Sequence, residues 1–318
     1  MTSDDAYNAL ILSGLKGVGP STIEKVLGLS SYPLKTALEL CEYAYELRKN
    51  SLTVEQFDEA RKYADFQVDM ASKNDTRVIS LLDAEFPKTL MASGVRLAVL
   101  YVKGNVGALN IPSVAVIGTR EPTPHGEEIT KRITDWMVQQ GWAIVSGLAL
   151  GCDSIAHKQA IESGGKTIAV MAHGLQTISP SRNKDLATSI LSSDGALVSE
   201  FGFDIKPAPT NFVIRDKTQS ALSRGVIMIQ SDLVGGSLHA SRAAIKDLRP
   251  LIVPFPTYKD IAHSESKISA NLLLASDDAI GKCNLLKCAS AGLENLHIIR
   301  RKEEYGRMLE ILSKDLSQ

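Results

Sequence analysis

The sequence predicts an α/β fold, in which a mostly parallel sheet follows a small N-terminal all-helical domain. Two patterns predict it. Up to about residue 70 the apolar residues recur at intervals of three and four, as they do on helices. From about residue 76 short apolar runs alternate with amphipathic stretches, which is the rhythm of strand, helix, strand in a parallel sheet. Three of these runs, VAVIG, AIVSG and IAVMA, do not alternate with polar residues, which is typical of strands buried on both faces.

The region before residue 72 is predicted to hold several helices and no strand. Between the first two helices, a turn over residues 15–21 contains Gly17, Val18 and Gly19, and Ser21 is a suitable N-cap for the next helix. This GVG turn resembles a helix-hairpin-helix, whose glycine amides can face a DNA phosphate. A plain connection between two helices is the favoured alternative, because a single copy of so short a motif is a weak signal.

Beyond residue 72 the chain predicts one sheet with helices between its strands. The expected strands cover residues 78–82, 97–102, 113–118, 142–146, 167–172, 196–199, 226–229 and 251–253. The expected helices cover residues 125–140, 153–163, 184–192, 216–222 and 237–247. We therefore divide the chain into a helical domain (1–72), a sheet domain (73–290) and a C-terminal tail (291–318) with a helix over about residues 302–314.

The composition indicates an ordinary globular protein. Of its 318 residues 44% are apolar, and 35 Lys and Arg against 36 Asp and Glu leave a net charge of −1. The protein is therefore not basic overall, although basic residues on one face are enough to hold phosphate. Four cysteines without a CxxC pair predict reduced thiols and no zinc site. Because the sequence shows no basic leader and no run of about 18 apolar residues, we expect a cytoplasmic protein without a membrane span.

Glycines gather where the predicted strands end. In an open parallel sheet, ligands bind at the carboxyl ends of the strands, where the strand order reverses. Gly147 and Gly151 follow one strand, and Gly235 and Gly236 follow another. Glycine permits close backbone approach and leaves helix amides free for an anion, so these loops predict a phosphate cradle. Tight strand-to-helix turns use glycine anyway, but several such loops on one edge, with Arg120 among them, favour a ligand.

The same loops lack two common nucleotide-binding motifs. They contain neither the dinucleotide-binding GxGxxG after the first parallel strand nor the P-loop GxxxxGK[ST], which argues against redox and NTPase chemistry. No metal and no cofactor is predicted. The basic residues near this edge, which are suited to phosphate, are Arg120, Lys166, Arg182, Lys206, Arg215, Lys217 and Arg224. The aromatic residues that could stack on bases there, with core packing as the alternative, are Phe201, Phe203 and Phe212.

Several long motifs, in order along the chain, resemble the DprA/Smf family of DNA-processing proteins of bacterial natural transformation. The family's GTR signature is matched by SVAVIGTREPTPHG, and its second signature by IVSGLALGCDSIAHKQAIESGGKTIAVMAHGL. The match continues through GALVSEF and VGGSLHASRAAIKDLRPLIVPFP. Before the first parallel strand, the family's pattern is matched by FPKTLMASGVRLAVLYVKGN. The resemblance covers about residues 8–280, and the N-terminal helices with their GVG turn resemble the family's SAM-like or helix-hairpin-helix region.

The resemblance implies an extended Rossmann fold and a binding protein without catalytic activity. The family binds single-stranded DNA without sequence preference, self-associates and helps to load the recombinase RecA, so the expected partners are single-stranded DNA, a RecA-type recombinase and a second copy of the chain. Residue by residue, the resemblance places phosphate-binding side chains at Arg120, Lys166 and Arg215. The complete predicted DNA- and phosphate-binding set is Gly118, Arg120, Ser146, Gly147, Gly151, Lys166, Arg215, Lys217, Gly235, Gly236 and Ser237.

Two residues depart from the family's F..RNR motif, because Asp216 stands in place of Asn and Lys217 in place of the second Arg. A carboxylate beside a phosphate pocket is expected to weaken binding by on the order of 1 kcal/mol. This change also fits a second hypothesis, in which the chain senses a small nucleotide, as domains of the wider SMF/DprA–LOG group are thought to do in defence systems.

A third hypothesis is a phosphoribohydrolase of the LOG type, whose PGGxGTxxE signature supplies a hydrolytic Glu. Aligned on the two glycines, this chain has Arg242 at the Glu position, and a guanidinium stays protonated. His157 and Asp153 share one face of a predicted helix, where a surface hydrogen bond or a helix cap is the favoured role. Cys152 begins that helix, where the pKa of a thiol can fall. No His and acid partner for it is evident in the sequence, so we expect no enzyme.

Overall fold

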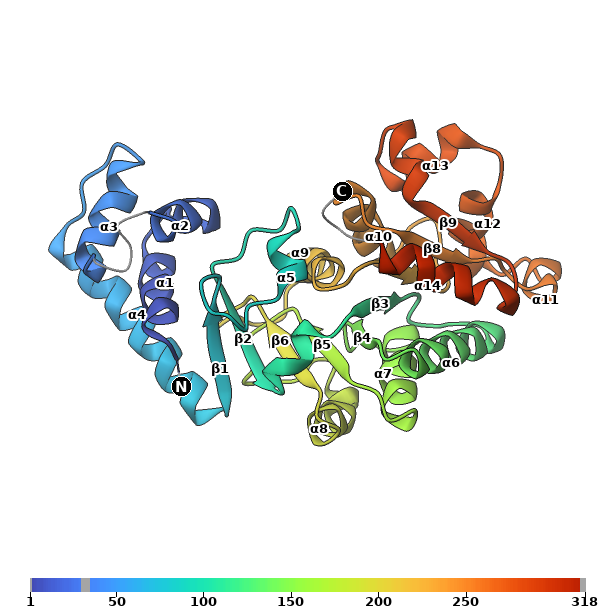
Figure 1. Ribbon diagram of the computed structural model, residues 1–318, viewed down its shortest axis with the longest axis horizontal. Coiled ribbons are helices and arrows are strands. Elements are labelled where there is room, and N and C mark those ends of the chain that lie inside the picture. The colour runs from blue at the N-terminus through green and yellow to red at the C-terminus, as the bar shows by residue number, and fades with distance from the viewer. Residues whose placement is uncertain (1, 30–34, 315–318) are drawn as a thin grey trace.

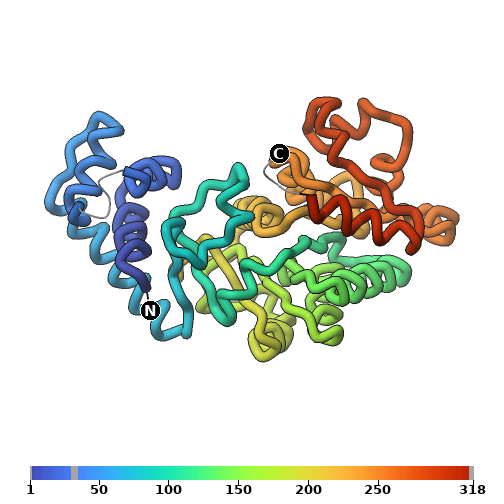
Figure 2. The backbone as a smooth tube through the Cα atoms, in the orientation of Figure 1, coloured from blue at the N-terminus to red at the C-terminus, as the bar shows by residue number. Residues whose placement is uncertain are grey.

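The computed structural model describes residues 2–29 and 35–314 (Figure 1). Residues 1 and 30–34 of the predicted helical domain, and residues 315–318 of the predicted tail, lie outside the described residues. The four N-terminal helices lie at one end of the molecule and the last elements of the described chain at the other, with the sheet between them (Figure 2). No helix in the described part of the chain is long and apolar enough to cross a membrane.

The N-terminal region folds into the helices α1 (Asp4–Gly14), α2 (Pro20–Leu27), α3 (Ala37–Glu46) and α4 (Val54–Lys73). Hydroxyl groups cap three of them, because Ser3, Thr36 and Thr53 each accept a hydrogen bond from a backbone N–H of the first turn. Helix α2 differs from the expectation that Ser21 caps it. Its N-cap is Gly19 and its first residue is Pro20, a position that suits the fixed φ of proline.

The described strands form one nine-stranded sheet in the order β1-β2-β6-β5-β4-β3-β7-β8-β9. Strands β1 and β2 are antiparallel to their neighbours, and all pairs from β6 to β9 are parallel. This confirms the predicted α/β class with a mostly parallel sheet. The strands are β1 (Thr76–Ser80), β2 (Val99–Gly104), β3 (Ser113–Ile117), β4 (Ala143–Ser146), β5 (Thr167–Met171), β6 (Ala196–Ser199), β7 (Val226–Met228), β8 (Leu251–Pro254) and β9 (Leu296–Ile299).

Helices cover both faces of the parallel part of the sheet. They are α5 (Lys88–Met91), α6 (Pro124–Gln139), α7 (Cys152–Glu162), α8 (Lys184–Ser192), α9 (Pro209–Ala221), α10 (Ser237–Lys246), α11 (Tyr258–Ala262), α12 (Ser269–Ala275), α13 (Ala279–Leu286) and α14 (Tyr305–Ser313). In β3, Val116 packs in one core with residues of α6, α7 and α14, while its neighbour Ala115 packs in another with residues of α9, α10, α12 and α13. Strands buried on both faces explain why the predicted runs are apolar throughout.

Several elements differ from the sequence prediction: helices α5, α11, α12 and α13 were not expected, and strand β9 and helix α9 differ as well. Strand β9 was not expected, yet it extends the sheet by pairing in parallel with β8. Its side chains are half-buried except for that of Ile299, so the strand lacks the strong apolar run that marks the central strands. Helix α9 begins at Pro209, earlier than the expected residue 216, because proline is favoured at the first position of a helix.

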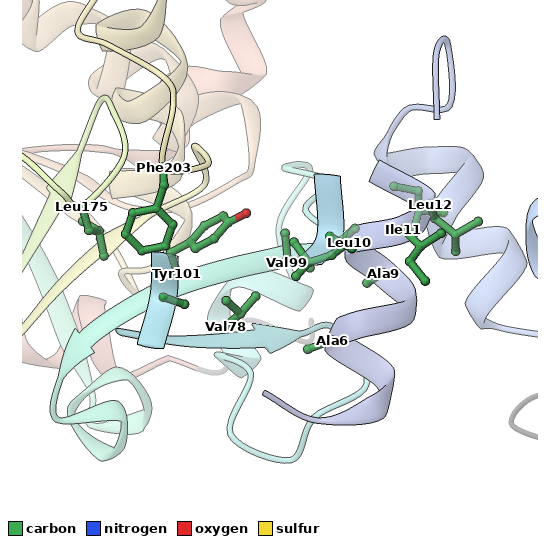
Figure 3. Packing of buried hydrophobic residues seen from close by; sticks show 14 of the residues in the cluster. Ala6, Ala9, Leu10, Ile11, Leu12, Val78, Val99, Tyr101, Leu175 and Phe203 are labelled. Atoms are coloured by element: carbon green, nitrogen blue, oxygen red, sulfur yellow. The ribbon is translucent and has the colours of Figure 1, made fainter. Parts of the chain in front are cut away.

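The N-terminal helices share a hydrophobic core with the edge of the sheet. Buried side chains of α1 and α4 pack in one cluster with Val78 of β1 and Tyr101 of β2 (Figure 3). Tyr101 also makes an edge-to-face ring contact with Phe203, at 5.5 Å between centroids. Gln67 of α4 is fully buried there, and its side-chain oxygen accepts hydrogen bonds from the Tyr101 hydroxyl and the Phe203 N–H, both at 3.0 Å. This polar link fixes the helices against the sheet.

Candidate functional site

The chain order of the strands creates a switch point between β3 and β7. From β3 the chain adds β4, β5 and β6 on one side, and it then returns to add β7, β8 and β9 on the other. The connections leave β3 and β7 in opposite directions, which opens a crevice at their carboxyl ends where ligands bind in such sheets. A cavity of about 730 Å³ lies at this place. The cavity lies at the edge of the sheet where the direction of the strands predicted a ligand.

Five segments line the cavity, and three of them bring six of the predicted residues together there. The loop after β3 contributes Gly118 and Arg120, and the loop after β7 leads into the start of α10 with Gly235, Gly236 and Ser237. Helix α9 contributes Arg215 among others. The loop after β4 and the start of α7 contribute Ala149 and Asp153. The short 3-10 helix η3 (Ser266–Ile268) supplies Lys267, which was not predicted from the sequence because it lies far along the chain from any strand end.

The start of α10 offers backbone donors to the cavity. No side chain of the described residues caps this helix, whose N-cap is Gly236. A Cβ atom on Gly236 would meet nothing within 4 Å, so the backbone is open on that side. The Ser237 hydroxyl donates to Ser231 Oγ at 2.7 Å, which fixes the turn before the helix. The amides of Leu238 and His239 donate to the carbonyl oxygens of Gly235 and Gly236, whereas those of Gly236 and Ser237 have no partner among the described residues. These two amides and the positive end of the helix dipole together favour an anion here.

Arg120 is the exposed cation of this wall. It lines the main cavity and a smaller adjoining one of about 130 Å³. No ion pair in the described part of the chain involves its side chain. Lys267 differs, because its Nζ lies 3.5 Å from Glu121 Oε2. Arg120 is therefore the cation of the cavity that is best placed to grip a phosphate with two donors.

Arg215 lies in the cavity wall but is almost fully buried, at 5% exposure. Its Nη1 donates to the carbonyl oxygens of Gly147, after β4, and of Val170, in β5, the latter at 3.0 Å. Its Nε lies 3.0 Å from Asp216 Oδ1. The guanidinium thus connects the ends of strands β4 and β5. Because it is buried next to the cavity, its positive charge acts on the cavity mainly at a distance.

Two carboxylates lie beside this guanidinium. Asp153 Oδ2 accepts a hydrogen bond from Gly147 N–H at 3.1 Å. Burial raises the pKa of Asp153, against the opposing effect of Arg215. Burial also raises the pKa of Asp216 to about 6, with Arg215 and Arg120 acting in the opposite direction and Asp153 in the same one. The departure from the family motif noted above therefore places a titratable carboxyl group in the wall of the cavity.

Two predicted glycines serve close packing. A Cβ on Gly151, whose φ is +76°, would lie 2.4 Å from the carbonyl oxygen of Thr119. A Cβ on Gly147 would lie 1.7 Å from Arg215 Nη1. Both positions therefore exclude any side chain, because the loops after β3 and β4 and the buried guanidinium touch there. Of the four glycines predicted to form a phosphate cradle, Gly235 and Gly236 line the larger cavity, and Gly147 and Gly151 do not.

Three predicted residues lie away from the cavity. Lys166 precedes β5, so it lies at the amino end of the parallel strands, and it is ion-paired with Asp194. Ser146 is fully buried and donates to the carbonyl oxygen of Val116 at 2.7 Å. Lys217 is exposed on α9 and does not line the cavity. A residue before a parallel strand and a residue after it lie at opposite edges of the sheet, which separates Lys166 from Arg120.

The side chains considered for catalysis lie in the interior. Burial raises the pKa of the Cys152 thiol to about 12, the opposite of the lowering that a helix start would cause. His157 is fully buried, with Nδ1 2.7 Å from Thr167 Oγ1, and burial lowers its pKa to about 3. Of the aromatic candidates, Phe203 belongs to the core and Phe212 lines the cavity. Among the described residues, no group of three His, Cys, Asp or Glu side chains gathers as a metal site.

A sheet of this order with a polar cavity at its switch point defines a Rossmann-like α/β protein of the ligand-binding class. A family model described as "DNA recombination-mediator protein A" matches residues 77–282. The chain belongs to this family, which is also called DprA or Smf.

Curated relatives carry the same names. Protein Smf of Escherichia coli K12 is 40% identical over 168 residues, which are 52% of this chain and 45% of that protein. Protein Smf of Synechocystis is 31% identical over 304 residues, which are 87% of this chain and 74% of that protein. DNA processing protein DprA of Bacillus subtilis is 37% identical over 48% of this chain and 51% of its own length. The aligned stretches thus span about half the length of several curated relatives.

Two solved structures of the family have the same fold. DprA of Streptococcus pneumoniae superposes with a TM-score of 0.66 and 25% identity, over 96% of this chain and 98% of that one. DprA of Helicobacter pylori superposes with a TM-score of 0.58 and 27% identity, over 73% of this chain and 95% of that one. The work on the Helicobacter protein describes its single-stranded DNA binding mode.

Proposed function

We propose that this protein binds single-stranded DNA, without sequence preference, through backbone phosphates at the cavity on the carboxyl edge of the sheet, and that it acts in DNA recombination or uptake. The observation that carries the proposal is that Arg120 and the uncapped start of α10 line the same cavity. Arg120 supplies a permanent cation with paired donors, and the start of α10 supplies backbone amides, so together they fit a phosphodiester. Family membership and the single-stranded DNA binding described for the Helicobacter relative support the same ligand.

The role proposed for the protein is to hold and hand over DNA, without a chemical step of its own. Its partners would be a RecA-type recombinase and a second copy of the chain, in the cytoplasm, as the family resemblance implies. We further propose that residues 1–72 form a helical domain carried on the edge of the sheet, with the tail from residue 291 closing its other side. Light scattering of the purified protein, with and without recombinase and oligonucleotide, tests these partners directly.

The test of DNA binding is fluorescence anisotropy with a labelled oligonucleotide of about 16 bases, a length that spans the known site sizes for single strands. The single strand is compared with its duplex at low and moderate salt. We expect tighter binding of the single strand and an affinity that falls steeply as salt rises, because phosphate contacts release counterions. Equal affinity for both forms, or no binding at low salt, would contradict the proposal.

A small nucleotide is the second candidate ligand, and one observation favours it. Four carboxyl groups line the cavity, those of Glu121, Asp153, Asp216 and Asp232. They can accept hydrogen bonds from the base and the sugar of a nucleotide, whereas a phosphate backbone offers them no donor. The volume also suits a small molecule. Competition by mononucleotides and dinucleotides in the same anisotropy assay separates the two ligands. Complete displacement of the labelled oligonucleotide by a short nucleotide, together with equal affinity for the short nucleotide and the long strand, would favour a nucleotide sensor over a DNA-binding protein.

A further inference from the structure

A cluster of cations lies outside the cavity, on helices α9, α10 and α13. It consists of Lys217 on α9, Arg242 on α10 and Lys287, the residue that follows α13. Helix α10 packs against both α9 and α13, and the three helices follow one another across one part of the molecule (Figure 1). Arg242 Nε donates to the carbonyl oxygen of Leu285, in the last turn of α13, at 2.8 Å. This bond holds the Arg242 guanidinium at the C-terminal end of α13, two residues before Lys287 in the chain.

His239 connects the cluster to the cavity. It lies one turn before Arg242 on α10, and it lines the cavity together with Ser237. Burial lowers the pKa of His239, and the positive charges of Arg242, Lys287 and Lys217 lower it further. The three cations therefore lie within electrostatic reach of one side chain that lines the cavity, although they come from three different helical segments.

The charge of the cluster is not neutralised by ion pairs. Within residues 2–29 and 35–314, no ion pair involves Lys217, Arg242 or Lys287. The carboxyl group of Glu200 lies within the electrostatic reach of Lys217, but it accepts a hydrogen bond from the Thr218 hydroxyl, and burial raises its pKa. Lys217 and Lys287 are exposed. In a chain with a net charge of −1, three unpaired cations on one surface form a local positive field.

We propose that Lys217, Arg242 and Lys287 form a phosphate track, which carries the single strand from the cavity across α9, α10 and α13. The track rests on the proposed function and specifies the path of the DNA: the strand leaves the cavity on the side of His239 rather than along the amino edge of the sheet. Lys217, which does not line the cavity, would then bind the strand outside it.

The test compares oligonucleotides of about 4 and about 16 nucleotides, the lower and upper ends of known single-strand site sizes. The variant is Lys217→Gln with Lys287→Gln, since both side chains are exposed and neither makes a hydrogen bond within the described part of the chain. The matched control is Lys131→Gln with Lys158→Gln, which removes two exposed charges from α6 and α7 on the other face of the sheet. Arg242→Gln provides a second, independent variant.

We expect the track variant to flatten the slope of log affinity against log salt for the long strand by about 1.4, since each lost contact on a single strand accounts for about 0.7. Its affinity for the long strand should fall on the order of tenfold or more at about 0.1 M salt. The affinity for the short strand and all values for the control pair should stay the same.

The outcomes separate this proposal from the one on which it rests. If the native protein binds neither strand, the proposed function fails. If it binds the single strand but the track variant and the control pair behave alike, the track fails and the DNA-binding cavity stands. Unchanged DNA binding together with a lost contact to an acidic recombinase surface would assign the cluster to a protein partner and would overturn the track.

Discussion

Nε of Arg215 lies 3.0 Å from Oδ1 of Asp216, its neighbour in the chain. Side chains at consecutive positions of a helix usually point apart, so this pair is held together by its surroundings. Arg215 is anchored behind the cavity wall by the carbonyl oxygens of Gly147 and Val170. Asp216 is at the wall itself. The pair therefore connects the ends of strands β4 and β5, which Arg215 holds, to the cavity surface that a ligand would contact.

Replacement of Arg120 by alanine should weaken binding of single-stranded DNA. The loss of one phosphate contact flattens the salt slope by about 0.7, which corresponds to roughly a fivefold loss of affinity at about 0.1 M salt. Anisotropy titrations over a range of salt concentrations measure both quantities. Lys131→Ala, an exposed residue on α6, serves as the control. An unchanged slope for Arg120→Ala would remove Arg120 from the phosphate site.

Asp216→Asn should strengthen DNA binding at about pH 8, where the carboxylate is charged and repels phosphate. The expected gain is about fivefold, from repulsion on the order of 1 kcal/mol. Burial raises the pKa of Asp216 to about 6, so the native protein should approach the affinity of the variant as the pH falls below that value. Titrations of both proteins between about pH 5 and pH 8 check this convergence. A constant ratio across the range would show that Asp216 does not face the bound strand.

The same carboxyl group should make stability depend on pH. Because its pKa is raised to about 6 in the folded protein, the folded state holds a proton that the unfolded chain has released. The free energy of unfolding should therefore fall as the pH rises from about 4 to about 6, by up to about 3 kcal/mol from this group. Urea unfolding of the native protein and Asp216→Asn measures the difference. The variant should lose that part of the pH dependence, and parallel curves would contradict the assignment.

Arg215→Gln should destabilise the fold more than a surface substitution does. It removes the hydrogen bonds to two strand-end carbonyls and leaves Asp216 without its charge partner, at a cost of about 3 kcal/mol. Lys217→Gln, two residues along α9 and exposed, should change the free energy of unfolding by less than about 0.5 kcal/mol. Denaturant unfolding of both variants gives the comparison. Similar values for the two would mean that the guanidinium does not support the wall.

Gly151→Ala should be strongly destabilising. The added Cβ would lie 2.4 Å from a backbone oxygen at a φ of +76°, so the loops after β3 and β4 would have to move apart. Gly141→Ala is the matched control, because its φ is +80° and a Cβ there would meet nothing within 4 Å. The control should cost about 1 kcal/mol from backbone conformation alone, and Gly151→Ala at least about 3 kcal/mol. Equal losses would show that the two loops yield easily.

Much of the fold follows from local patterns. The apolar runs at β3, β4 and β5 predict strands buried on both faces, because no polar side chain breaks them. The direction of parallel strands then predicts which edge collects Gly118, Arg120 and Gly236. Strand β9 could not be predicted in this way, since it lies at the edge of the sheet and is only half-buried. Its pairing depends on β8, far away in the sequence.

The sequence by itself determined the α/β class, the family and the edge of the sheet at which the cavity lies, because residue periodicity and motif order are local properties of the chain. Only the tertiary structure decided which predicted residues meet. It separated Lys166 from the cavity, buried Arg215 behind the wall, and gathered Lys217, Arg242 and Lys287 from three helices. The physical reason is that burial and charge proximity arise from packing between distant segments, and no spacing along the chain encodes those distances.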